Sequence, residues 1–187
     1  MNYVLLLSFV FLLFAGCSKL EIQPDPLNSG DESALKSAET KNVTMGFNIV
    51  FTGIYDFSGD PICSDPVNMV RIINTGEGTG THFGKLTHYF SFCVDVTDNS
   101  YPNDHMMAYF EDENGDRLDV EVAGWVLPGR VPGMPNFAIS YFKDPFNILG
   151  GTGRFEGATG GGVTNDYNSS KDPYSHHHWK GKITLVK

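Results

Sequence analysis

Alternation of apolar and polar residues is the main pattern of the chain after about residue 43. The longest run covers 86–97, where every second residue from Leu86 to Val96 is apolar except His88. A period of two is typical of a strand with one buried face, so we expect about eight strands and no helix. The other segments that we predict as strands are 45–51, 70–72, 105–111, 118–122, 137–141, 179–185 and the two flanks of a glycine-rich stretch at 150–162.

The glycine-rich stretch Gly150–Gly162 predicts a tight corner between two strands. Glycine enters positive-φ conformations without a Cβ clash, and Phe155 is the one large side chain able to anchor the corner in a core. A phosphate-binding loop is the alternative. The third glycine of a dinucleotide fingerprint would fall on Glu156, however, and no helix pattern follows to receive a phosphate.

Asp112-Glu113-Asn114-Gly115 predicts a hairpin turn between two strands, because Asn-Gly supplies the positive φ angles of a tight turn. The spacing of its acids also imitates the start of a calcium loop. An EF-hand needs glycine at position 6 and glutamate at position 12, where this chain has Arg117 and Ala123. The segments 125–135, rich in proline, and 165–175, rich in polar residues, are predicted as loops.

The stretch Ile148–Gly160, with Gly150-Gly151-Thr152-Gly153-Arg154-Phe155 at its centre, resembles the GG[ST]GxFxGAxG segment of the allene oxide cyclase and dirigent barrels. Gly76–Lys85 and Asn114–Leu118 resemble segments of secreted bacterial lipoprotein relatives of that fold. The resemblance implies a single eight-stranded antiparallel β-barrel, allene oxide cyclase-like or calycin-like. The plant cyclases use a glutamate near their first strand, and Met45–Ile54 contains no acid, so the resemblance implies the fold rather than cyclase activity.

The first 16 residues contain no charged side chain and end in Phe14-Ala15-Gly16 before Cys17. The apolar run is too short to span a bilayer, and small residues before a cysteine are typical of a lipoprotein signal. We therefore expect a signal peptide over 1–16 and acyl chains on Cys17 that hold the protein on a membrane. Ser18 after this cysteine, rather than an acid, resembles the sorting signal of lipoproteins of the outer membrane, which implies that part of the cell envelope and leaves the membrane face open.

Residues 17–42 are rich in Ser, Glu, Asp, Lys and Pro, and we interpret them as the lipidated cysteine and a flexible tether. Residues 43–187 have the length of one domain, which is predicted as the barrel. The formal net charge of −9 argues against a nucleic-acid partner, because phosphates need a basic face. The oligomeric state is left open.

Cys63 and Cys93 are the two cysteines that remain once Cys17 is assigned to lipid. An exported domain favours a disulfide between them, and two buried free thiols are the alternative. His176-His177-His178 is interpreted as surface loop rather than a metal site, because consecutive residues of an extended chain point to alternating sides.

His88 interrupts an apolar face, so we expect it inside the barrel or at its rim, as a satisfied core histidine or a polar anchor for a ligand. Arg71 and Tyr109 are weaker candidates for the same pocket. We find no serine-histidine-acid order, paired-carboxylate spacing or nucleotide motif, and therefore assign no catalytic residue, metal or cofactor.

The sequence thus predicts a lipid-anchored barrel in the cell envelope that binds a small or partly apolar molecule without transforming it. An isomerase or cyclase of the resembling fold is one alternative. A structural surface lipoprotein with a filled barrel is another. An open barrel interior favours binding or catalysis, whereas an interior filled with side chains favours the structural role.

Overall fold

The computed structural model describes residues 41–58 and 62–187. The predicted signal peptide, Cys17 and nearly all of the predicted tether lie outside the described residues. Among the described residues, no helix is long and apolar enough to cross a membrane.

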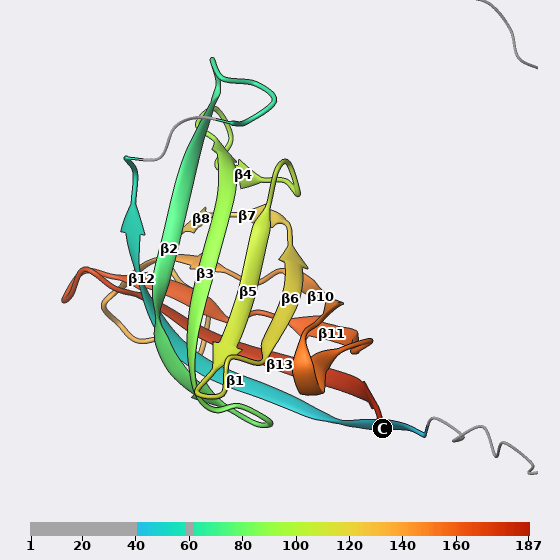
Figure 1. Cartoon of the computed structure of the whole chain (residues 1–187). Helices are drawn as coiled ribbons and strands as arrows, with labels where there is room; N and C mark the ends of the chain where they lie inside the picture. The colour runs from blue at the N-terminus through green and yellow to red at the C-terminus, as the bar shows by residue number, and fades with distance from the viewer. Residues whose placement is uncertain (1–40, 59–61) are drawn as a thin grey trace, which may run out of the picture. The chain divides into compact units, whose positions relative to one another are not determined.

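Within this part of the chain, eight antiparallel strands form a closed barrel in the order β1-β2-β3-β5-β6-β10-β11-β13, and β13 pairs again with β1 (Figure 1). The all-β prediction with eight barrel strands is therefore confirmed. The strands are β1 Asn42–Asp56, β2 Met69–Gly80, β3 Gly84–Asp95, β5 Met107–Asp112, β6 Arg117–Val122, β10 Pro145–Gly151, β11 Thr159–Val163 and β13 Ser175–Val186.

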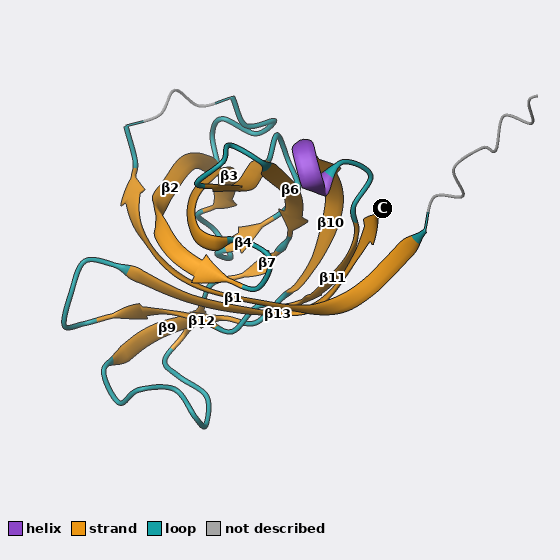
Figure 2. Cartoon of the chain, turned by 60° about the horizontal axis from the view of Figure 1, so that its bottom comes forward, coloured by secondary structure: helices purple, strands orange, loops and turns teal. Residues whose placement is uncertain are grey.

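The pairing of β1 with β13 closes the ring, and it runs in one register from Asn42 opposite Val186 to Gly53 opposite Ser175. Seen along the barrel in Figure 2, these two strands form one long wall of the ring. Because every barrel strand is paired on both sides, closure removes the exposed edges that an open sheet would present.

Five shorter strands lie outside the ring of eight. β12 (Asp166–Ser169), β9 (Ala138–Phe142) and β8 (Leu127–Pro128) extend the sheet from the first residues of β13, and Figure 2 shows β9 and β12 beyond the ring. β4 (Ser100–Tyr101) pairs with β7 (Gly124–Trp125). The prediction of loop for 165–175 was therefore wrong at 166–169, where β9 and β13 supply pairing partners.

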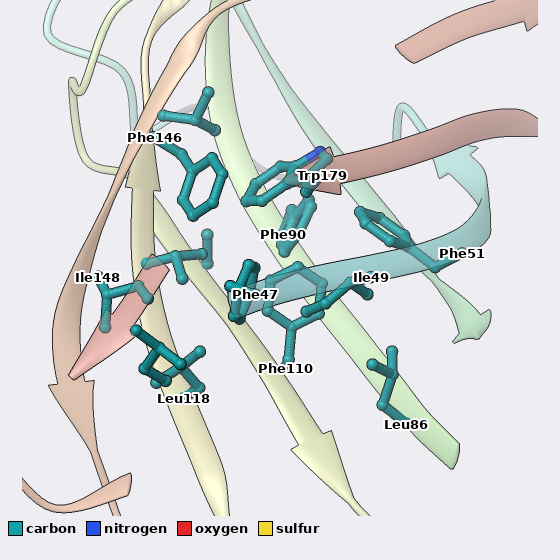
Figure 3. Close-up of a cluster of buried hydrophobic side chains, with 14 of the residues drawn as sticks. Phe47, Ile49, Phe51, Leu86, Phe90, Phe110, Leu118, Phe146, Ile148 and Trp179 are labelled. Carbon is teal, nitrogen blue, oxygen red and sulfur yellow. The ribbon is translucent and has the colours of Figure 1, made fainter. Parts of the chain in front are cut away.

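Large apolar side chains fill much of the barrel interior. Phe47, Ile49 and Phe51 project inward from β1, as the alternation predicted, and pack against rings from the opposite wall (Figure 3). Trp179 of β13 stacks on Phe146 at 4.8 Å between ring centroids. Burial of such rings is the main source of stability for the fold, at about 25 cal/mol per Å² of apolar surface removed from water.

The glycine corner lies between β10 and β11 and contains one 3₁₀ turn, η1 (Gly153–Phe155). Phe155 is fully buried and stacks on Phe83 at 4.6 Å, so the predicted anchor is confirmed. Gly153 has φ +57°, and a Cβ there would meet the carboxylate of Asp116. Glycine is therefore required at this position by both conformation and space.

The hairpin predicted at Asp112–Gly115 joins β5 to β6. Asp112 Oδ1 accepts hydrogen bonds from the amides of Asn114 (2.8 Å) and Asp116 (3.0 Å), and its Oδ2 pairs with Arg154 of the glycine corner. Burial alone would raise the pKa of Asp112, but the two amides and the Arg154 guanidinium hold it below its ordinary value. The same carboxylate thus closes the hairpin and ties it to the corner.

Cys63 and Cys93 form a disulfide across a sequence separation of 30 residues. Both cysteines are buried. Cys93 lies on the outer face of β3, whereas His88 lies on its inner face. The bond therefore fastens the segment before β2 to the outside of the barrel wall. In the chain-entropy model a loop of this length contributes about 3 to 4 kcal/mol of stability.

Candidate functional site

A cavity of about 50 Å³, partly open to solvent, lies in the interior of the barrel domain. Strands from around the ring supply its walls, and β4 and β9 add Tyr101 and Phe142. Most of the lining is aromatic or aliphatic. The polar residues of the lining, apart from the tyrosine hydroxyls, are Asn74, Thr164, Asp166 and His177.

His88 lies behind this cavity and reaches it through Asn74. It is 3% exposed, and its Nε2 lies 2.8 Å from Asn74 Oδ1, an acceptor, so Nε2 is the donor. Burial, and the neighbouring His177, lower the pKa of His88 to about 3. His88 is thus a neutral, buried histidine, and of the two positions left open by the sequence, interior or rim, it occupies the interior.

Asn74 connects His88 to a second group of polar side chains. Asn74 Nδ2 donates to Ser175 Oγ at 3.0 Å, and Ser175 Oγ donates to the carbonyl of Gly53 at 3.2 Å. Ser175 Oγ is also 2.8 Å from His177 Nε2. A continuous polar network therefore runs from β3 through β2 to β13 within an otherwise apolar interior.

Asp166 of β12 completes the network at the cavity wall. Its Oδ2 accepts a hydrogen bond from Trp179 Nε1 at 2.8 Å, and its Oδ1 accepts one from the amide of His178 at 3.0 Å. His177 Nδ1 lies 2.9 Å from Asp166 Oδ2 without hydrogen-bond alignment. Asp166 is 4% exposed, so these contacts replace the water that a buried carboxylate would otherwise need.

Ser175, His177 and Asp166 thus stand in the spatial order of a hydrolytic triad, an arrangement that the sequence analysis missed. The signal was present in part: Ser175-His176-His177 places the serine and His177 on one face of a strand. Asp166 could not be assigned, because its segment was predicted as loop. Ser175 is completely buried and already bonded to Asn74 and Gly53, so its hydroxyl is not presented to a substrate.

Two tyrosines and a second carboxylate surround Asp166. Burial raises the pKa of Tyr55 to about 12, and the charge of Asp166 acts in the same direction. Burial, together with the hydrogen bond that Tyr101 donates to Asp144, raises the pKa of Tyr101. The pKa of Asp144 is raised by burial and, in smaller part, by Asp166. Two carboxyl groups and two tyrosine hydroxyls therefore share this part of the domain.

Arg71 and Tyr109 do not share the site with His88, and their grouping in one pocket is corrected here. Arg71 lies opposite Cys93 in the β2–β3 register, on the outer face of the wall. Tyr109 also lies outside, stacked on Tyr89 at 5.5 Å, with the Arg117 guanidinium 4.0 Å from its ring centroid. Tyr109 thus faces away from the buried residues Ala108 and Phe110 that precede and follow it in β5.

The three consecutive histidines lie in β13 rather than in a surface loop, which corrects that prediction. They alternate as the extended backbone requires: His177 is buried in the network, while His176 and His178 lie on the outer face. His176 Nε2 is 3.0 Å from Asp172, and His178 Nε2 is 2.8 Å from Asn48. In the described part of the chain, no three His, Cys, Asp or Glu side chains gather as metal ligands.

A scan against protein-family models, a search of curated proteins and a search of solved structures find no match to this chain. The class of protein therefore follows from the geometry. It is an antiparallel eight-stranded β-barrel with a small aromatic-lined cavity and a buried polar network beside it.

Proposed function

We propose that the chain is a lipid-anchored protein of the cell envelope, in the outer membrane, whose barrel binds a small or partly apolar molecule without transforming it. The observation that supports binding is the cavity, where aromatic walls meet a few fixed polar groups. This combination is typical of small-ligand sites, in which apolar walls supply affinity and polar groups supply orientation.

The size of the cavity limits the ligand. Drug-sized ligands occupy pockets of about 300 to 1,000 Å³, and this cavity measures about 50 Å³. A compact molecule of a few heavy atoms, or the end of a longer one that extends through the open side, fits this space. If no ligand enters the cavity, we expect the barrel to have a purely structural role.

An isomerase or cyclase is a second candidate, and the Ser175–His177–Asp166 contacts are the observation that favours it. An imidazole held beside a carboxylate can move a proton, which is the step that isomerisation needs. Native mass spectrometry of the protein purified gently from its own envelope separates the two candidates. A ligand retained with unchanged mass supports binding, and conversion of an added ligand supports turnover.

Filling the cavity is expected to abolish ligand retention. Ala108 lines the cavity and is 5% exposed, so Ala108→Leu places extra methyl groups in the space that the ligand would occupy. We expect retained ligand to fall at least ten-fold in native mass spectra. Met107→Leu, at the preceding residue on the outer face of the same strand, is the matched control. Equal retention by both variants would exclude this cavity as the site.

The membrane anchor is tested separately, because Cys17 lies outside the described residues. Acylation is expected to add the mass of the lipid to an amino-terminal peptide that begins at Cys17 and to place the protein in the membrane fraction. Cys17→Ala is expected to move most of the protein to the soluble fraction with its fold unchanged. An unmodified Cys17 in protein purified from cells would contradict the anchor and leave the cavity proposal intact.

A further inference from the structure

The charge around the cavity indicates which small molecules it selects. Asp166 lines the cavity directly, and Tyr101, another lining residue, donates a hydrogen bond to the carboxylate of Asp144. Lysine and arginine are absent from the described lining. Asp166 also contributes to the raised pKa values of Tyr55, Tyr101 and Asp144, so its charge reaches several groups around this space.

The aromatic lining adds to this preference. Rings of Phe90, Phe92, Tyr101, Phe142 and Trp179 border the cavity. Aromatic faces carry negative charge density and attract organic cations, more strongly when water is excluded. An anion would meet both the carboxylates and the ring faces, whereas a cation is stabilised by both.

His177 is the lining residue that lies next to Asp166. Its side chain is more than nine-tenths buried, and Nδ1 has no hydrogen-bond partner among the described residues although it lies 2.9 Å from Asp166 Oδ2. The unpartnered ring nitrogen therefore faces the Asp166 carboxylate, and a donor placed between the two atoms would satisfy both. A polar atom that is buried without a hydrogen bond is also a site where a ligand donor is favourable.

We propose that the cavity selects a small organic cation, a primary or methylated ammonium group on a short apolar stem. The ammonium group lies near Asp166, and the stem packs among the rings. This inference rests on the proposed binding function and narrows its ligand class. It assigns Asp166 as the specificity-determining residue and Asp144 as a secondary contributor through Tyr101.

The test compares three probes of similar size: propylammonium, 1-propanol and propionate. The readout is the indole N–H resonance of Trp179, because this group donates to Asp166 and borders the cavity. The chain has two tryptophans, and Trp125→Phe, which removes the exposed one, assigns the signal. We expect propylammonium to bind at least ten-fold more tightly than 1-propanol, with propionate the weakest.

Asp166→Asn is expected to bring propylammonium within about two-fold of 1-propanol, while the amide oxygen still accepts one of the two native hydrogen bonds. Asp144→Asn is the second variant, with an expected loss of about three-fold in affinity for propylammonium, and the wild-type comparison does not depend on either variant folding.

Equal binding of cation and alcohol, or tighter binding of propionate, overturns the charge preference and leaves the binding function standing. If none of the three probes shifts Trp179, the cation proposal fails. If, in addition, Ala108→Leu leaves ligand retention unchanged, the binding function fails with it.

Discussion

Replacement of Phe51 by alanine is expected to lower the free energy of unfolding by about 3 to 5 kcal/mol, the range for truncating a buried phenylalanine. Phe51 is 2% exposed, and its ring stacks on His177 with centroids 4.4 Å apart and lies 4.7 Å from His88. It also contacts Phe90, Phe110 and Trp179. The substitution therefore opens a void between the apolar core and the polar network.

The measurement is urea unfolding at pH 7 followed by circular dichroism. Val50→Ala is the matched control, since Val50 is the preceding residue of β1, faces outward and is 49% exposed. We expect the control to change stability by less than about 1 kcal/mol. A similar loss in both variants would mean that Phe51 is not the packing centre that these contacts indicate.

Acid is expected to destabilise the fold well above the pH at which carboxylates titrate. His88 has a folded pKa of about 3, whereas the ordinary value is 6.5. Between these two values the unfolded chain binds a proton that the folded chain does not, so stability falls as pH decreases from 6.5 towards 3. The loss attributable to His88 is about 3 kcal/mol between pH 7 and pH 4.

Unfolding free energies measured at pH 7, 5.5 and 4 test this expectation. His88→Gln keeps a donor for Asn74 and cannot titrate, so it is expected to lose most of the slope in this window. His178 also has a lowered pKa, but it is partly exposed and contributes less. His105→Asn, at an exposed site with positive φ that asparagine tolerates, is expected to keep the wild-type slope. An unchanged slope in His88→Gln would refute this assignment.

The polar network also illustrates why sequence patterns located some site residues and not others. His88 was expected inside the barrel or at its rim because it stands in a long run with one apolar face. Arg71 was assigned to the same pocket although it lies between Val70 and Ile72, where alternation favours the other face, and the structure agrees with the alternation. Tyr109 could not be assigned in this way, because both faces of its strand contain large apolar residues.

The amino-acid sequence by itself determined the local elements of this protein. Two-residue alternation defined most barrel strands, Asn114-Gly115 defined a hairpin, and the glycine corner with Phe155 defined a turn anchored in the core. Each of these depends on backbone conformation or on the facing of neighbouring residues, which a few consecutive positions determine.

Only the tertiary structure decided which strands meet and which side chains share the cavity. The pairing of β1 with β13 joins the two ends of the domain, and β12 forms only because β9 and β13 flank it. Asn74 and Ser175 come from separate strands and meet through that closure, and Asp166 reaches the network through the pairing of β12 with β13. An alternation of apolar and polar residues with a period of two determines on which face of its own strand a residue lies. The neighbour across the barrel depends on long-range register and strand order, which local sequence does not contain.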